Sequence, residues 1–282
     1  MCFNLRYRLV HKLGYFIASL PIVGNLCYKL AQAMVRCYDN DGNHNRYSNG
    51  EYHLLKYLLD RHLLKTVFDV GANIGDYSAI IASQKTGVGK IYAFDPRDSN
   101  VETLRSRFSG MQDVSIVQTA LSDKDGRIDF YQNSDPSQSG TDSVHDMAKI
   151  GYSLKSNKIS VACKTIDQVS IENHIDHINL LKIDVEGHEL SVLKGAKRML
   201  SEKNIDYIQF EFGHAARVTR VLLLDIVVLF HTYGYNMYLI LPKGLKPFTY
   251  SPWEENRYNI VNFLAVSNSA PDDLNDIVIK RI

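Results

Sequence analysis

A glycine-containing loop at residues 69–75, with the sequence DVGANIG, constrains the fold of this chain more than any other feature. It follows the apolar stretch 66–68 and precedes the helix-like stretch 77–82. A strand, a glycine turn and a helix in this order open a nucleoside-cofactor site at the carboxyl edge of a parallel sheet. We expect the glycines to let a bulky ligand approach the backbone closely, because a Cβ atom there would collide with it.

The spacing of this loop favours S-adenosylmethionine over NAD. A dinucleotide site has the pattern G-x-G-x-x-G and places the pyrophosphate at the helix N-terminus. Here Asp69 takes the position of the first glycine, and Gly71 and Gly75 are spaced as G-x-x-x-G. A carboxylate at that position repels a pyrophosphate and attracts a cation, such as the ammonium group of a methionine moiety. An NAD-dependent oxidoreductase is the enzymatic alternative, and an ordinary strand-to-helix turn is the structural one.

The bulk composition fits one large α/β domain with a small appendage, because 282 residues with 45% hydrophobic content can bury a sizeable core. The net charge of +1 provides no field that would favour nucleic acid as a partner. The four cysteines form no C-x-x-C pair, which is typical of a reducing compartment without a structural zinc site. We therefore expect a cytoplasmic protein.

The first 38 residues differ from the rest, since they carry five basic side chains and no acidic one. Their uncharged run, residues 13–28, is interrupted by Gly and Pro and is shorter than the ~20 apolar residues of a spanning helix. Three interpretations remain: helices packed on the catalytic domain, a basic helix pair at the inner face of a membrane, or a signal peptide ending near residues 31–33.

The polar stretch 39–45 is typical of a linker. We therefore expect residues 1–50 to form a helical extension with its linker, and residues 51–282 to form the catalytic domain. Within that domain strand and helix patterns alternate, which predicts a doubly wound sheet. The predicted strands are 66–70, 90–94, 114–119, 127–132, 159–165, 180–185, 205–212, 235–240 and 260–266, and the predicted helices are 51–64, 77–84, 100–108, 189–200 and 218–230.

A long polar segment, residues 134–158, is unusual for a connection inside a compact domain. Such segments are often functional, and we expect a lid that becomes ordered when substrate binds. Its candidate contact residues are Ser139, Thr141, Asp142, Ser143 and His145.

Asp95 ends the second predicted strand, twenty residues after Gly75. A carboxylate at this place can accept hydrogen bonds from both ribose hydroxyls of a nucleoside. Enzymes that use NAD have the same feature, so Asp95 supports a nucleoside without choosing between the two cofactors. The structural alternative is that Asp95 only begins the turn at Pro96.

Charged side chains gather at the end of the predicted strand 180–185. Asp184, Glu186, His188 and Glu189 follow its apolar residues, and a cluster of costly charges at a strand end usually marks a cleft. These residues are candidates to hold the cofactor amino group, to orient a substrate hydroxyl, or to bind a divalent cation with water. The alternative is a helix start with acids near its positive end.

A second group of candidates follows the predicted strand 205–212. Glu211 lies within an apolar strand, which is unusual unless it faces the site, and His214 lies just beyond the strand end. The candidates for a general base are therefore Asp184, Glu186, His188 and His214. We favour proton removal without a metal ion over a metal-assisted route, and predict no metal site.

The motifs together resemble the FkbM family of S-adenosylmethionine-dependent methyltransferases. The resemblance runs from about residue 65 to residue 212, and the block KIDVEGHELSVLKG at 182–195 is its specific part. It implies a Rossmann-like fold with a seven-stranded, mostly parallel sheet whose last strand is antiparallel. It also implies methylation of hydroxyl groups on sugars or polyketide-type products.

The resemblance further implies roles for single residues. It places Asp69, Gly71, Asn73 and Gly75 at the methionine end of the cofactor, Asp95 at the ribose, Ala120 and Leu121 with Ser122 beside the adenine, and Asp184 and Glu186 at the transfer site. The family often has a small residue where this chain has His188.

The resulting hypothesis is an O-methyltransferase that acts on a sugar, a glycan or a related natural product. Aromatic residues in the last third of the chain, among them Tyr235, Tyr250, Trp253 and Tyr258, fit sugar rings because aromatic faces stack on them. A non-catalytic module of the same fold, held at a membrane surface, is the alternative outside enzymology.

Overall fold

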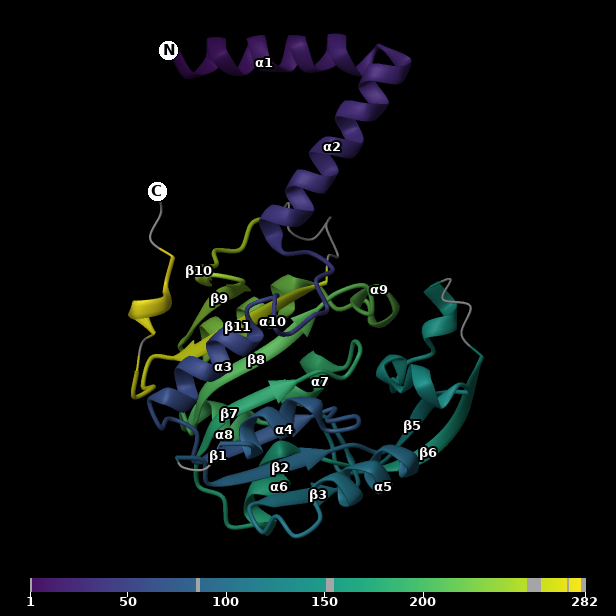
Figure 1. The fold of residues 1–282 in the computed structure, drawn as a ribbon, viewed down its shortest axis with the longest axis vertical. Helices are drawn as coiled ribbons and strands as arrows, with labels where there is room; N and C mark the ends of the chain where they lie inside the picture. Colours follow the sequence, from purple (N-terminus) through teal and green to yellow (C-terminus); the bar gives the residue numbers. More distant parts are fainter. Residues whose placement is uncertain (1, 85–86, 151–154, 253–259, 273, 280–282) are drawn as a thin grey trace. The chain divides into compact units, whose positions relative to one another are not determined.

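The computed structural model describes residues 2–84, 87–150, 155–252, 260–272 and 274–279. The chain divides into two compact units, residues 1–42 and residues 43–282. The segment 43–50 therefore belongs to the larger unit, whereas the sequence pattern assigns it to the extension. The smaller unit consists of α1 (Cys2–Ala18) and α2 (Pro21–Asp39), and Pro21 begins the second helix (Figure 1).

Among the described helices, none combines the length and the apolar character needed to cross a membrane. Peripheral contact of residues 1–38 with a membrane surface stays a prediction, as does packing of these helices on the catalytic domain.

The larger unit contains an eight-stranded sheet with the order β10-β9-β11-β8-β7-β1-β2-β3. The run from β3 to β8 is parallel, and β11 lies antiparallel between β8 and β9. The expected mostly parallel Rossmann-like sheet with an antiparallel last strand is confirmed, and β10 adds an unpredicted edge strand. The strands are β1 (Thr66–Val70), β2 (Lys90–Phe94), β3 (Val114–Val117), β7 (Ile178–Ile183), β8 (Ile205–Phe212), β9 (Tyr235–Leu241), β10 (Gly244–Pro247) and β11 (Val261–Ser267).

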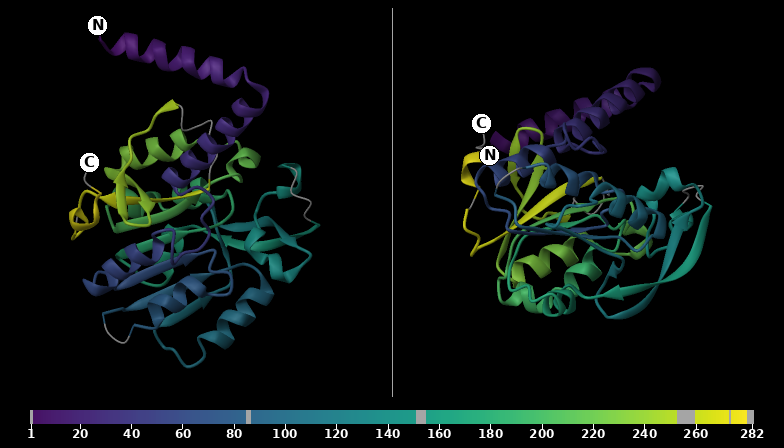
Figure 2. Two further views of the ribbon diagram at one scale, coloured as in Figure 1. Left: turned by 45° about the horizontal axis from the view of Figure 1, so that its top comes forward. Right: turned by 60° about the horizontal axis from the view of Figure 1, so that its bottom comes forward.

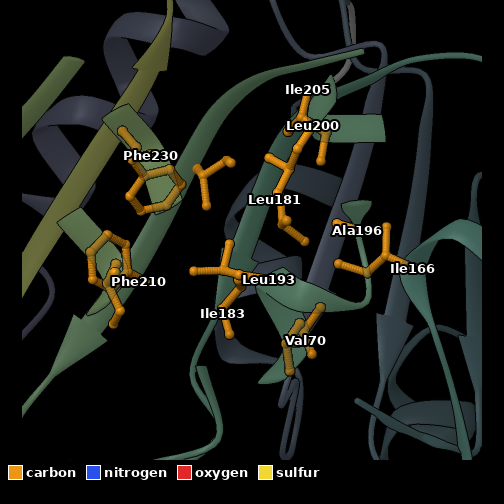
Figure 3. Packing of buried hydrophobic residues seen from close by; sticks show 14 of the residues in the cluster. Val70, Ile166, Leu181, Ile183, Leu193, Ala196, Leu200, Ile205, Phe210 and Phe230 are labelled. Carbon is orange, nitrogen blue, oxygen red and sulfur yellow. The ribbon is translucent and has the colours of Figure 1, made fainter. Parts of the chain in front are cut away.

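Helices cover both faces of this sheet (Figures 1 and 2). Successive strand residues point to opposite faces, so Val67 packs in one buried cluster with Leu58, and Phe68 packs in another with Phe230. Figure 3 shows the second cluster, in which Leu181 and Leu193 meet. The helices are α3 (Glu51–Asp60), α4 (Asp76–Ala82) and α5 (Asp98–Arg107), then α6 (Ile166–Glu172), α7 (Glu189–Lys194), α8 (Lys197–Ser201), α9 (Ala216–Thr219), α10 (Leu223–Thr232) and the short η4 (Asn275–Ile277).

A separate three-stranded sheet with the order β4-β6-β5 lies beside the carboxyl ends of β1 and β2 (Figure 1). It consists of β4 (Ala120–Leu121), β5 (Gly126–Asn133) and β6 (Ser156–Lys164). The strands predicted at 127–132 and 159–165 thus exist, but they pair with each other outside the main sheet. The predicted lid segment connects them and contains the short helices η1 (Pro136–Thr141) and η2 (Met147–Ile150).

Two predicted helices are each divided in the structure. The helix predicted at 189–200 breaks between α7 and α8, where a Cβ on Gly195 would lie 2.0 Å from the carbonyl oxygen of Ser122. The helix predicted at 218–230 breaks between α9 and α10, where Arg220 has a φ of 56°. Contacts with distant segments override the helical period in the first case, and a left-handed residue ends the helix in the second.

Candidate active site

A cavity of about 430 Å³ lies where the carboxyl ends of β1, β2, β7 and β8 meet the three-stranded sheet. This volume is in the usual range for a small-molecule site. Most of the expected site residues line it, namely Gly71, Asn73, Asp95, Ala120, Leu121, Asp184, Glu186 and His188. The expected residues that do not line it are Asp69, Gly75, Ser122, Glu189 and His214, together with Ser143 and His145 of the predicted lid.

Contacts within the protein already require glycine at positions 71 and 75, whether or not a ligand is bound. Gly71 has a φ of +79°, and a Cβ on it would lie 1.9 Å from the carbonyl oxygen of Asp184. Gly75 has a φ of +84°, and its Cβ would lie 2.7 Å from a methyl carbon of Leu104. Gly71 thus allows close contact with the chain after β7, and Gly75 allows close contact with α5. The sequence pattern did not indicate these two contacts.

Asp69 points away from the cavity. Its flanking residues Phe68 and Val70 share one face of the sheet, so Asp69 points to the other face. There its Oδ2 accepts a hydrogen bond of 2.6 Å from Ser78 of α4. Burial raises the pKa of Asp69, and the positive charge of Lys182 opposes that shift. Asp69 therefore connects the end of β1 to α4.

Asp95 lines the cavity and holds the glycine loop in place. Its carboxylate accepts the backbone N–H of Asn73 and of Arg97, both at 2.9 Å, and the side-chain amide of Asn100 at 3.2 Å. Burial raises the pKa of Asp95 to about 6, although these hydrogen bonds favour the ionised form. An ionised Asp95 at neutral pH retains capacity to accept from a ligand, because a carboxylate offers about four acceptor positions.

Three carboxylates converge at the other end of the cavity. One oxygen each of Asp184, Glu186 and Glu211 lie within 4.8 Å of one another, close enough to hold a cation between them. The Lys182 ammonium contacts Asp184 at 2.8 Å and neutralises one of the three. Glu186 has the left-handed φ of 51°, and its carbonyl accepts a hydrogen bond from Ser143. A strained residue in a cleft is a feature of functional sites.

The crowding changes the protonation of these groups. Burial raises the pKa of Glu211 to about 8, with a further contribution from the charge of Asp184. Burial and the charges of Asp184 and Glu211 raise the pKa of Glu186 well above its usual value. Burial also acts to raise the pKa of Asp184, but Lys182 lowers it overall. A carboxylate with a pKa near neutrality is suited to accept a proton.

The two candidate histidines occupy different environments. The ring nitrogens of His188 are 2.9 Å from the Ser122 hydroxyl and 3.2 Å from His145, and burial lowers its pKa to about 4. His188 is therefore neutral at pH 7, and it connects the turn after β7 to Ser122 and to His145 of the predicted lid segment. His214 lies in an adjoining cavity, which Glu186 and Glu211 also line.

Residues 134–150 of the predicted lid contribute to the cavity wall and contact the rest of the site. Asp142 forms a buried ion pair of 2.6 Å with Arg97, and the Ser139 hydroxyl donates to the side-chain oxygen of Asn73 at 2.8 Å. Ser139, Thr141 and Asp142 line the cavity. Residues 151–154 of the lid lie outside the described residues, and ordering on substrate binding stays a prediction.

Sequence reasoning missed several residues of the site. His44, Arg46, Asn49 and Glu51 line the cavity, although the pattern predicted a linker for part of this segment. The signal was a series of charged and amide side chains directly before an amphipathic helix. Among the aromatic candidates, Tyr235 is buried and donates to a carbonyl of β8, and Trp253 and Tyr258 lie outside the described residues.

The raised pKa values predict a loss of stability at alkaline pH. Burial raises the pKa of Glu189 to about 7 and that of Glu211 to about 8, so the folded state keeps protons that the unfolded chain has released. The free energy of unfolding therefore falls as pH rises from about 6.5 to about 8.5. The lowered pKa of His188 acts only below this window.

Thermal unfolding between these pH values tests this prediction. We expect the Tm of Glu211→Gln to exceed that of the unmodified protein at pH 8.5 by about 2–8 °C, since each kcal/mol corresponds to about 2–4 °C in a domain of this size. At pH 6.5 the two should differ less. Melting curves that shift in parallel with pH would contradict the assignment of this titration to Glu211.

Known proteins show the following similarities. The chain is 28% identical over 168 residues to the hexuronic acid methyltransferase AglP of Haloferax volcanii, covering 58% of this chain and 64% of that protein. It is 24% identical over 152 residues to the 2-O-methyltransferase NoeI of Sinorhizobium fredii, covering 51% and 62%. The chain thus spans less than two thirds of the length of either relative.

A crystal structure of a methyltransferase FkbM from Methylobacillus flagellatus has a TM-score of 0.46 and 19% identity, covering 72% of this chain and 44% of that one. The family described as the methyltransferase FkbM domain matches residues 69–237, which is more than half of the chain. The chain therefore belongs to the FkbM family of methyltransferases.

Proposed function

We propose that this chain transfers a methyl group from S-adenosylmethionine to a hydroxyl group of a sugar or glycan. The observation that carries the proposal is one cavity that is lined at one end by the glycine loop and Asp95, and at the other by Asp184, Glu186 and Glu211. The names of the two relatives, a hexuronic acid methyltransferase and a 2-O-methyltransferase, support a sugar as the acceptor.

The lining residues fit this cofactor. Asp95 is suited to accept the ribose hydroxyls, and Ala120 and Leu121 offer apolar surface for the adenine. Asn73 of the glycine loop and Asp184 of the carboxylate cluster also line the cavity and are suited to the methionine end. S-adenosylmethionine supplies a methyl group on a positively charged sulfur. Acidic side chains favour such a cation, whereas they would repel the pyrophosphate of NAD.

The residues of the chain then have two tasks. The first is alignment of the acceptor hydroxyl with the methyl group, which contributes about 7–11 kcal/mol to lowering a barrier. The second is removal of the hydroxyl proton, and we assign it to Glu186, whose raised pKa makes it a better base than Asp184. We propose that no metal ion is needed, since Lys182 already neutralises part of the cluster.

A binding measurement followed by an assay tests the function. Calorimetry should show S-adenosylhomocysteine binding to the purified chain and no comparable binding of NAD. Incubation with methyl-labelled S-adenosylmethionine and a panel of neutral and uronic-acid oligosaccharides should then yield a product heavier by one methyl group. Tight NAD binding would support the oxidoreductase alternative, and cofactor binding without transfer to any hydroxyl acceptor would support the non-catalytic module.

A further inference from the structure

The segment Asn43–Gly50, here named the strap, is anchored firmly beside the cavity. Gly50 has a φ of +103°, and a Cβ on it would lie 2.2 Å from the carbonyl oxygen of Leu241 at the end of β9. The N–H groups of Ser48 and Asn49 donate to the carbonyl of Asn45, each at 2.8 Å. The strap therefore has a defined turn structure that packs on the sheet.

A buried polar network connects the end of the strap to the sheet and to α4. Asn49 is 1% exposed, and its side-chain amide donates to Glu51 at 2.5 Å. The other oxygen of Glu51 accepts from Gln209 of β8 at 2.8 Å. The side-chain oxygen of Gln209 accepts from the Tyr77 hydroxyl at 2.8 Å. Four partnered polar groups fix the position from which Arg46 extends.

Arg46 has an unused hydrogen-bond donor at the cavity. Its side chain lines the cavity, and its Nη1 atom is buried without a hydrogen-bond partner among the described residues. Lys182, a second basic side chain near the carboxylates, is already paired with Asp184 at 2.8 Å. A buried guanidinium nitrogen without an acceptor is costly, so the position of Arg46 indicates a ligand oxygen that is absent from the protein itself.

Arg46 lies near the end of the cavity where the methionine part would bind. Burial raises the pKa of Asp69 at the end of β1, and the positive charge of Arg46 opposes that rise. The same charge adds to the effect of Lys182 in lowering the pKa of Asp184 beyond the end of β7. No ion pair joins Arg46 to a carboxylate among the described residues, so the guanidinium stays available to a ligand.

We propose that Arg46 binds the α-carboxylate of the methionine part of S-adenosylmethionine. The inference rests on the proposed function. The methionine end carries one ammonium and one carboxylate, and the acidic cluster is suited only to the ammonium. A guanidinium presents paired N–H donors that match the two oxygens of a carboxylate. The site then has acidic side chains for the ammonium group and Arg46 for the carboxylate.

Calorimetric titration with two nucleosides tests whether Arg46 binds the α-carboxylate or another part of the ligand. S-adenosylhomocysteine carries the α-carboxylate, whereas 5′-methylthioadenosine has the same adenosine and thioether but lacks the amino-acid end. We expect Arg46→Gln to weaken S-adenosylhomocysteine binding by about 10–100-fold, the usual loss for a charged hydrogen-bond partner. The same variant should leave binding of 5′-methylthioadenosine within about twofold. Arg46→Lys should recover part of the loss, because it restores the charge without the paired donors.

Lys56→Gln is the matched control, because it removes a positive charge from an exposed position of α3 and should change neither affinity. Thermal unfolding of each variant identifies a folding defect. If Arg46→Gln is unstable, Arg46→Lys is compared with the unmodified chain instead. Equal weakening of both nucleosides by Arg46→Gln would overturn the proposal, because it would mean that Arg46 only shapes the cavity. Unchanged binding of both would also overturn it and point to the acceptor. An unmodified chain that binds neither nucleoside would sink the proposed function itself.

Discussion

Asp95→Ala is expected to weaken binding of S-adenosylhomocysteine by at least about 100-fold. Each hydrogen bond from a ribose hydroxyl to a carboxylate is worth about 1.5–3 kcal/mol, so two of them give a loss of about 3–6 kcal/mol. Each 1.4 kcal/mol corresponds to about tenfold in affinity. The substitution also removes the acceptor of the Asn73 N–H, which loosens the glycine loop at its middle. Calorimetry of the folded variant measures the effect.

The control for Asp95 is Asn100→Ala. Asn100 is 4% exposed and donates to Asp95 at 3.2 Å, but it does not line the cavity. Its removal disturbs the support of Asp95 and leaves the carboxylate in place, so we expect a loss of less than about tenfold. An affinity of Asp95→Ala within threefold of the unmodified chain would remove the ribose role from Asp95.

Glu186→Gln is expected to lower turnover by about 10²–10⁴-fold while S-adenosylhomocysteine binds with nearly unchanged affinity. The amide has the shape of the carboxylate and occupies the same left-handed backbone position, so the loop should keep its geometry. It cannot accept the hydroxyl proton, and only the chemical step should suffer. Single-turnover rates with labelled cofactor measure that step separately from product release.

Glu211→Gln is the comparison for this second experiment, because Glu211 belongs to the same cluster but comes from β8. A larger loss of turnover in Glu211→Gln than in Glu186→Gln would move the base to Glu211. Retained turnover in both would direct attention to His214, in the adjoining cavity. Activity that disappears in EDTA and returns with a divalent cation would instead make these carboxylates metal ligands.

The main sheet was predictable where the local pattern is strong. The strands at 66–70, 90–94 and 205–212 have the predicted bounds, because runs rich in β-branched and aromatic residues end there at turn-forming residues. The short strand β10 and helix α6 were not predicted. Strand β10 consists of only Gly244–Pro247, and its stability comes from pairing with β9 rather than from its own residues.

The position of the strap could not be predicted from its own residues. Its polar residues resemble a linker, and no local signal distinguishes a solvated turn from one that packs on a sheet. Gly50 meets the carbonyl of Leu241, and Glu51 meets Gln209, in both cases across a long stretch of sequence. These partners are decided by the folding of the whole domain, and with them the position of Arg46 at the cavity.

The sequence by itself determined the parallel sheet, the glycine loop and the carboxylates at the strand ends, because the alternation of strands and helices along the chain and the turn chemistry follow from local sequence. Only the tertiary structure decided which of these groups face the cavity. Asp69 and Asp95 both lie at the end of an apolar strand, yet the pleat turns Asp69 toward Ser78 and leaves Asp95 on the cavity wall. Likewise, His188 is held by Ser122, which follows β4, and by His145 from the segment between β5 and β6. Side-chain direction depends on which neighbours fill the space around a strand, and those neighbours come from distant parts of the chain.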